Sequence, residues 1–168
     1  MVNEIKSCKM YNFPAILGIV NSCSDWLSVQ GMNHWKEYYT QETVQWKFQN
    51  TDIFGLFFDE TLSGVVSLSS KMPLYYVQKE LSYFQDPESK AFYISMLAVD
   101  PIKHKQGIAS QLMTFAEDYA GKYDIKFIRL EAYAPYAELN QFYRKRNYNL
   151  VQTRDDEGDL MNFYEKKI

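Results

Sequence analysis

The apolar run Ala91–Val99, "AFYISMLAV", constrains the fold of this chain more than any other segment. A run of this length with almost no polar residue predicts a strand that is buried on both faces of a sheet. Asp100 and Pro101 end the run, and apolar residues at helical spacing follow from Ile108 to Tyr119. The sequence therefore predicts a central strand, a short basic corner and a helix.

Further strands and helices are predicted on both sides of this unit. Before it, we expect a strand near Glu4–Lys9, a helix from Ile16 to Leu27 ending at Gly31, a short helix capped by Thr40, and a hairpin of residues 52–59 and 62–70. After it, the corner helix ends at Gly121, and we expect a strand over 126–134, a helix over 136–147 and a hairpin turning at Glu157–Gly158. This order predicts an α/β (α+β) fold with a central mixed sheet flanked by helices.

One segment, from Lys71 to Lys90, has no clear pattern. A structureless loop of that length is unusual inside a compact domain. It either extends the neighbouring strands, forms a short helix or makes a wall of a functional site.

The totals of the sequence limit the classes of function. The 168 residues, 46% of them hydrophobic, suit one domain spanning 1–168. A net charge of -3 argues against binding to nucleic acid or to an anionic membrane surface, and we find no apolar window of membrane-spanning length. The two cysteines, Cys8 and Cys23, have neither metal-site nor disulfide-framework spacing, which favours a metal-free protein of the reducing cytoplasm.

The basic corner "DPIKHKQG" is a candidate anion site. The first turn of a helix has amide N–H groups without helical partners and the positive end of the helix dipole, and Gly107 lets a ligand approach the backbone closely. Neither the P-loop pattern nor the G-x-G-x-x-G dinucleotide pattern is present. From these features alone, a phosphate site and a simple tight turn with solvated lysines remain equal alternatives.

The neighbours of the corner favour the first alternative. The stretch "MLAVDPIKHKQGIASQLM" resembles the acetyl-CoA-binding motif of the GNAT superfamily of N-acetyltransferases, which reads L-x-V-x-P and then [Arg/Gln]-x-x-Gly-x-[Gly/Ala]. The departure is His104, which stands where Arg or Gln is usual. The residues that match are Leu97, Val99, Pro101, Gly107 and Ala109.

A second stretch, "FYRKRNY", resembles the "FYxKxGF" element of the same superfamily. Asn147 replaces its glycine and Tyr148 its final phenylalanine. The preceding "IRLEAYAPY" resembles the strand before that element, with Tyr136 where Asn is frequent. The order of elements agrees over nearly the whole chain.

The resemblance implies a GNAT-like acyltransferase fold, acetyl-CoA as cosubstrate and no metal. It implies direct transfer of the acetyl group, in a ternary complex, to a primary amine of a small molecule, a peptide N-terminus or a lysine. The pantetheine arm would lie along the central strand and the pyrophosphate on the corner. The residues implied for cofactor binding are Met96, Leu97, Val99, His104, Lys105, Gln106, Gly107, Ile108 and Ala109.

Two residues are candidates for proton transfer. An alkylamine with a pKa of about 10.4 is mostly protonated at neutral pH, so a base or a water chain must take its proton. Glu131 is the acid in the second central strand and is a candidate base, although strand alternation also allows it to point outward. Tyr143 matches the usual general acid of the superfamily, and it also fits an ordinary core aromatic beside Phe142.

The acceptor is not identified by any pattern in the sequence. The high aromatic content, 17%, supplies rings for a pocket or for a homodimer contact. Because of the departures at His104, Tyr136 and Asn147, a non-catalytic CoA-binding or interaction module remains the alternative to an enzyme. The aromatic candidates for an acceptor pocket are Trp35, Tyr38, Tyr39, Tyr75, Tyr76 and Tyr83.

Overall fold

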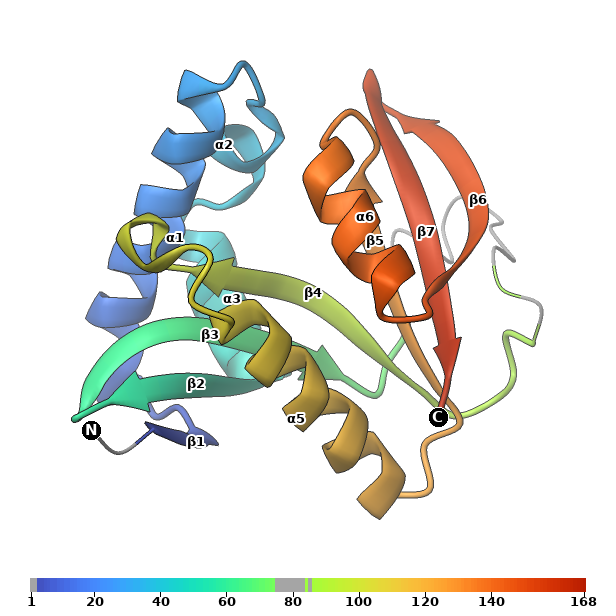
Figure 1. Ribbon diagram of the computed structural model, residues 1–168, viewed down its shortest axis with the longest axis horizontal. Coiled ribbons are helices and arrows are strands. Elements are labelled where there is room, and N and C mark those ends of the chain that lie inside the picture. The colour runs from blue at the N-terminus through green and yellow to red at the C-terminus, as the bar shows by residue number, and fades with distance from the viewer. Residues whose placement is uncertain (1–2, 75–83, 85) are drawn as a thin grey trace. The chain divides into compact units, whose positions relative to one another are not determined.

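A computed structural model of the chain describes residues 3–74, 84 and 86–168 (Figure 1). The strands are β1 (Asn3–Ser7), β2 (Asp52–Phe58), β3 (Thr61–Ser69), β4 (Ala91–Val99), β5 (Phe127–Tyr133), β6 (Asn149–Asp156) and β7 (Asp159–Lys167). The helices are α1 (Phe13–Val29), α2 (His34–Tyr38), α3 (Gln41–Asn50), α5 (Ile108–Lys122) and α6 (Ala137–Lys145), with 3₁₀ turns η1 (Met10–Asn12) and η2 (Pro101–Lys103). The strands form a mixed sheet in the order β1-β2-β3-β4-β5-β7-β6, which confirms the predicted fold class.

The chain divides into two compact units. The first comprises Met1–Leu68 and Met96–Ala116, and the second comprises Ser69–Ser95 and Glu117–Ile168. β4 and α5 each contribute residues to both units. The single domain over 1–168 stays a prediction.

In the first unit, β1, β2 and β3 pair antiparallel, as a hairpin preceded by an edge strand. The hairpin turns at Asp59 and Glu60, both with positive φ, as a tight turn between twisted strands requires. The Thr43 N–H donates to Thr40 Oγ1 at 3.2 Å, so the predicted cap of α3 is confirmed. The core packs α1 and α3 against the strands through Ile16, Val20, Val44, Ile53, Val65, Met96 and Ala98.

In the second unit, β4 and β5 pair parallel, from Ala91 with Phe127 to Ile94 with Leu130. β5 pairs antiparallel with β7, and β7 pairs with β6 in the predicted C-terminal hairpin. That hairpin turns at Glu157 and Gly158, with φ of 55° and 100°. Both predicted turn residues are thus confirmed.

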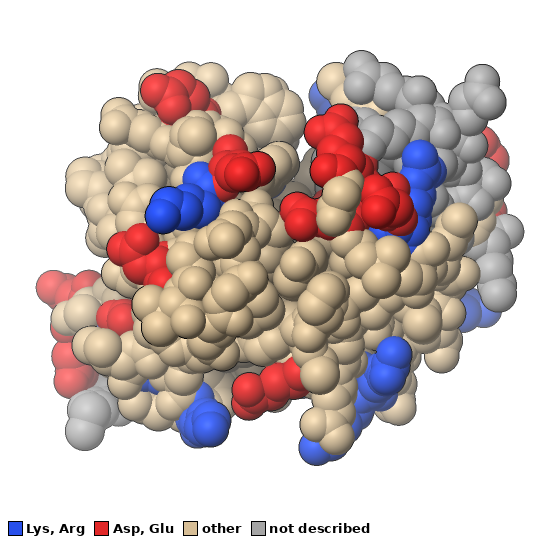
Figure 2. All heavy atoms as spheres, turned by 90° about the horizontal axis from the view of Figure 1, so that it is seen from above, with Lys and Arg blue, Asp and Glu red and all other residues tan. Residues whose placement is uncertain are grey.

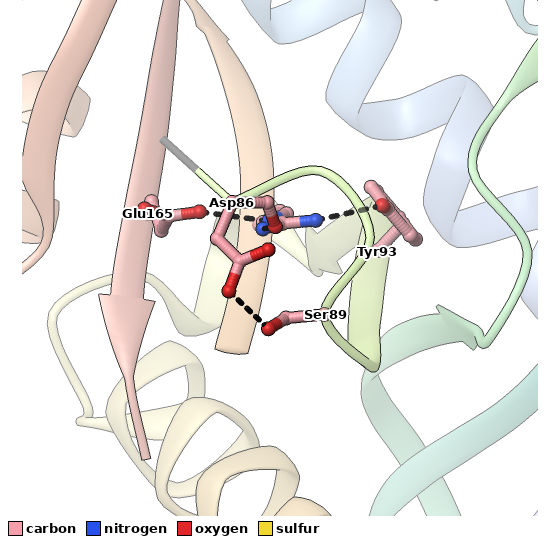
Figure 3. A network of polar contacts seen from close by, with 5 residues as sticks. Asp86, Ser89, Tyr93 and Glu165 are labelled. Carbon is pink, nitrogen blue, oxygen red and sulfur yellow. Dashed lines mark hydrogen bonds and ion pairs between the residues drawn. The ribbon is translucent and has the colours of Figure 1, made fainter. Parts of the chain in front are cut away.

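A buried arginine on β5 lies at the centre of a network of polar contacts (Figure 3). Arg129 is fully buried, and its Nε donates to Glu165 on β7 at 2.8 Å. It also donates to the Tyr93 hydroxyl at 3.0 Å and to the carbonyl of Asp86. The Phe84 ring lies 4.6 Å from the guanidinium. These contacts tie the chain just before β4 to the sheet.

Within the segment 71–90, for which three alternatives were predicted, residues 75–83 and 85 lie outside the described residues. The three alternatives therefore stay open. Tyr75, Tyr76 and Tyr83 also lie outside them.

Candidate functional site

The end of β4 presents alternate residues to different surroundings. Met96 and Ala98 are buried in the core of the first unit, whereas Leu97 and Val99 are half-buried. This alternation follows from the period of a strand. Leu97 and Val99 are thus the predicted cofactor residues of β4 with partly accessible side chains.

A structured corner joins β4 to α5. Asp100 caps η2 by accepting from the Ile102 N–H at 3.2 Å, and its own N–H donates to the Ser63 carbonyl on β3 at 3.0 Å. Two residues of the corner then adopt left-handed backbone conformations, Lys105 with φ of 63° and Gly107 with φ of 76°. The chain can therefore reverse from the strand into the helix within a few residues.

The first turn of α5 directs its backbone amides toward this corner. The first helical hydrogen bond of this turn joins the Gln111 N–H to the Gly107 carbonyl at 3.0 Å, so helix geometry leaves the N–H groups of Ile108 and Ala109 without helical partners. A Cβ at Gly107 would have no neighbour within 4 Å. Open space beside backbone N–H groups at a helix start fits a phosphate. The residues present therefore fit the pyrophosphate of coenzyme A.

Gly64 on β3 packs closely against the start of α5, and it was not among the residues predicted for the site. A Cβ at this position would lie 2.8 Å from Ile108 Cγ2, 3.0 Å from the Ala98 carbonyl oxygen and 3.2 Å from Leu112 Cδ1. Only a residue without a side chain lets the strand approach the start of α5 this closely. An isolated glycine inside a strand pattern is the signal that was available.

His104 points back to β4. Its Nε2 lies 3.1 Å from the Val99 carbonyl oxygen, and its ring packs edge-on against Trp26 of α1 at 4.9 Å. The Cys23 thiol donates to the same carbonyl at 3.1 Å. The residue that departs from the superfamily pattern is therefore held between α1 and β4.

The basic side chains of the corner differ in their surroundings. Lys103 Nζ donates to Ser63 Oγ at 2.8 Å and lies 5.8 Å from the Phe58 ring centroid, so it is tied to the β2–β3 hairpin. Lys105 and Gln106 are exposed. Of the two lysines, Lys105 is the one whose side chain is open to solvent.

Tyr143 belongs to the second unit, on α6, where it is buried. Its ring lies 5.8 Å from each of the rings of Tyr148 and Tyr164. Burial, with a smaller contribution from Tyr164, raises the pKa of Tyr143 well above its usual value. The phenol therefore keeps its proton at neutral pH, as a general acid must.

Glu131 lies on the opposite face of the same sheet. It pairs with Phe163 across the β5–β7 ladder, and Arg129 pairs with Glu165, so alternation places all four on one face. Tyr143 packs on the other face, against Tyr164. The two predicted catalytic side chains therefore do not share a face of this sheet, and their roles stay predictions.

The C-terminal end of α6 accommodates both departures in "FYRKRNY". Asn147 has φ of 65°, and the N–H of Tyr148 donates to the Tyr143 carbonyl at 3.1 Å, as in a Schellman motif. Asparagine tolerates this left-handed conformation better than most residues. The extra hydroxyl of Tyr148 donates to Glu117 at 3.2 Å. Both replacements therefore preserve the local structure.

Acidic side chains gather over the β6–β7 turn (Figure 2). The carboxylates come from Asp155, Asp156, Glu157 and Asp159. They create a local negative potential that repels anions and attracts cations.

Two further findings concern the described part of the chain. Within it, no three or more His, Cys, Asp or Glu side chains are grouped so as to hold a metal ion. None of its helices combines the length and apolar character needed to cross a membrane.

The family model of the acetyltransferase (GNAT) family matches residues 20–148 of the chain. This match confirms the predicted resemblance. A search of curated proteins found no match.

Solved structures of N-acetyltransferases share the fold. The PaiA N-acetyltransferase of Thermoplasma acidophilum, in complex with coenzyme A, has 18% identity over 100% of both chains and a TM-score of 0.75. A GNAT acetyltransferase of Listeria monocytogenes has 15% identity over 99% of this chain and 95% of that one, with a TM-score of 0.79. The ribosomal-protein-S18-alanine N-acetyltransferase of Escherichia coli has 15% identity over 99% and 94%, with a TM-score of 0.71. At these identities the similarity shows the fold alone.

Proposed function

Because this chain belongs to the GNAT acetyltransferase family, we propose that it transfers an acetyl group from acetyl-CoA to a primary amine. The acceptor class is a small amine, a peptide N-terminus or a lysine side chain. The observation that carries the proposal is the corner between β4 and α5, where helix-start amides face open space beside Gly107. A cytoplasmic location and a homodimer remain predictions beside it.

The corner would hold the pyrophosphate through backbone donors. The N–H groups from Gly107 to Ala109 and the helix dipole favour an anion there, and Lys105 adds an exposed charge. Coenzyme A bound in this way presents a thioester to the acceptor.

The pantetheine arm would follow the end of β4. Met96 is buried, so only its main chain would contribute, whereas Leu97 also offers a half-buried side chain. The Val99 carbonyl already accepts from Cys23 and His104, which satisfies both of its lone pairs. We therefore expect Val99 to contribute through other atoms than its carbonyl oxygen.

The reaction requires two proton movements. The neutral amine forms a C–N bond to the acetyl carbonyl carbon and loses a proton to a base, and the C–S bond breaks. We propose that Tyr143 gives its proton to the departing thiolate and regains one from solvent. Its raised pKa keeps the phenol protonated at neutral pH, so the proton is present when the thiolate departs. Glu131 remains the candidate base, and a water chain is the alternative.

The alternative function is a CoA-binding module without catalysis, for which the departures at His104, Tyr136 and Asn147 are the motive. The structure of the α6 end weakens that motive, because Asn147 adopts the left-handed conformation that glycine would supply. Binding of CoA without turnover would favour this alternative.

Turnover tests the proposal directly. The protein is incubated with acetyl-CoA and a panel of amines while free CoA is followed. Saturable, amine-dependent release of CoA is expected, and no release across a broad panel would leave only the alternative.

A matched pair of glycine variants tests the site. Gly107→Ala and Gly31→Ala both place a side chain at a positive φ, 76° and 81°, with no neighbour within 4 Å. Their intrinsic backbone strain is therefore similar. We expect Gly107→Ala alone to weaken CoA binding by about tenfold, because its methyl group would occupy the phosphate approach. Equal affinities of the two variants would contradict the assignment.

A further inference from the structure

We propose that His104 is a positioning residue that fixes the pyrophosphate-binding corner by bonding back to the Val99 carbonyl. The inference rests on the proposed function, since it concerns the corner assigned there to coenzyme A. The hydrogen bond of 3.1 Å joins the last residue of β4 to the residue that follows η2. It therefore closes the chain around the turn from which the anion-binding amides emerge.

The hydrogen bond determines which ring nitrogen carries a proton. A carbonyl oxygen only accepts, so Nε2 must be the donor. Both the neutral Nε2–H tautomer and the protonated ring satisfy this requirement. The contact with Val99 therefore requires only that Nε2 carries a proton.

Two other contacts involve the same pair of residues, His104 and Val99. The Trp26 ring packs edge-on against His104 at an interplanar angle of 80°, and the Cys23 thiol donates to the Val99 carbonyl. Both residues come from α1. His104 therefore connects the corner to α1 through Trp26 and to β4 through the Val99 carbonyl.

The opposite side of the corner is tied independently to β3. Lys103 Nζ bonds Ser63 Oγ, and the Asp100 N–H bonds the Ser63 carbonyl. These contacts hold η2 itself. What they do not reach is the stretch from His104 to Gly107, which contains both left-handed residues. His104 is the side chain of this stretch that is bonded to β4.

The superfamily pattern places Arg or Gln at this position, and both are N–H donors. A glutamine side chain carries an amide donor that can reach a carbonyl, whereas alanine has none. Phenylalanine keeps an aromatic contact with Trp26 but cannot donate. The three substitutions therefore separate the hydrogen bond from the ring contact.

The experiment measures two ligands on the wild-type protein and on His104→Gln, His104→Phe and His104→Ala. Coenzyme A carries the pyrophosphate, and pantetheine lacks it. Titration calorimetry gives the Kd of CoA, and ligand-observed NMR gives the weaker Kd of pantetheine. Thermal unfolding of each variant checks the fold.

We expect the Ala and Phe variants to bind CoA about tenfold more weakly, because each loses the one hydrogen bond that orders the site. The affinity for pantetheine should be unchanged. The Gln variant should retain at least half of the wild-type affinity for CoA. Unchanged pantetheine binding shows that a variant is folded, and if the Ala variant fails to fold, the Gln and Phe variants decide.

Three outcomes would overturn the proposal. In the first, the Ala and Phe variants bind CoA as the wild type does. In the second, the Gln variant loses as much affinity as the Ala variant. In the third, CoA and pantetheine lose affinity equally. A wild-type protein that binds no CoA would overturn the proposed function first, so the two failures are distinguishable.

Discussion

The Tyr164 hydroxyl donates a hydrogen bond of 2.9 Å to Asn140 Oδ1, one turn before Tyr143 on α6. Asn140 is buried, and its Nδ2 lies within 2.7–3.2 Å of the carbonyl oxygens of Tyr133, Ala134 and Tyr136. One amide therefore joins the end of β5, the start of α6 and β7. Tyr143 lies on the same helix, one turn after Asn140.

Replacing Asn140 with Ala should lower the free energy of unfolding by about 3 kcal/mol, because buried carbonyls and the Tyr164 hydroxyl lose their partner. Chemical denaturation measures the change. Asn149→Ala is the control, since Asn149 is exposed on β6, and its effect should stay within about 0.5 kcal/mol. Similar losses for the two variants would contradict the role of Asn140.

Replacing Tyr143 with Phe tests the general acid. The ring contacts with Tyr148 and Tyr164 remain, so we expect little change in unfolding temperature. The kcat for amine acetylation should fall by about 100-fold, with a similar KM for acetyl-CoA, because the thiolate leaves unprotonated. Tyr148→Phe, which removes a hydroxyl bonded to Glu117, is the matched control. Wild-type kcat in the Tyr143 variant would rule out the role.

Several of these features follow from local sequence. The Thr40 cap, the Glu157–Gly158 turn and the glycine at the start of α5 are each specified by a few adjacent residues. The alternation of side chains along β5 was also enough to predict that Glu131 can point away from the other site residues. Local chemistry therefore predicted most of the elements and the position of the corner.

The remaining features depend on residues far apart in the chain. Arg129 and Glu165 pair although they are 36 positions apart in the chain. His104 packs against Trp26 across 78 positions (104 − 26). The local sequence around these residues does not indicate either contact. Gly64 reads as a weak point in a strand until the close approach of Ile108 is known. Such contacts are set by sheet register and helix docking, which no local pattern encodes.

The Arg129–Glu165 pair predicts a large stability effect. Arg129→Met leaves Glu165 buried without this partner, which should lower the free energy of unfolding by about 3–5 kcal/mol. The double variant with Glu165→Leu should recover part of the loss, and denaturant titrations of the four proteins give the coupling energy. Arg146→Met is the control. Its partner Glu117 still pairs with Lys166 in this variant, so the free energy of unfolding should fall less than in Arg129→Met. Additive single effects would contradict a coupled pair.

Gly64→Ala tests the close packing beneath the corner. The added methyl group would meet the Ala98 carbonyl, which is backbone and yields little, so α5 or β3 must shift. We expect a loss of about 1–3 kcal/mol in unfolding free energy and weaker CoA binding. Gly18→Ala is the control, since a Cβ at this position of α1 meets nothing within 4 Å and should stabilise the helix by about 0.5–1 kcal/mol. A neutral Gly64 variant would show that the contact relaxes freely.

The buried thiol of Cys23 predicts a stability loss in alkaline solution. Burial raises the pKa of Cys23 from 9.0 to about 12, and the donor contact with Val99 belongs to the protonated form. Because the unfolded thiol ionises first, this contribution is complete below pH 9.0 and is lost as pH rises toward 12.

Cys23→Ser keeps a donor for the Val99 carbonyl and does not titrate in this range. From pH 9 to pH 11, we expect the wild type to lose on the order of 2 kcal/mol more stability than the Ser variant. Cys8→Ser is the matched control, and its difference from the wild type should be smaller, because burial raises the pKa of Cys8 only to about 11. Urea denaturation at each pH measures the three proteins. Parallel curves for the wild type and the Cys23 variant would show that the thiol ionises equally well in both states.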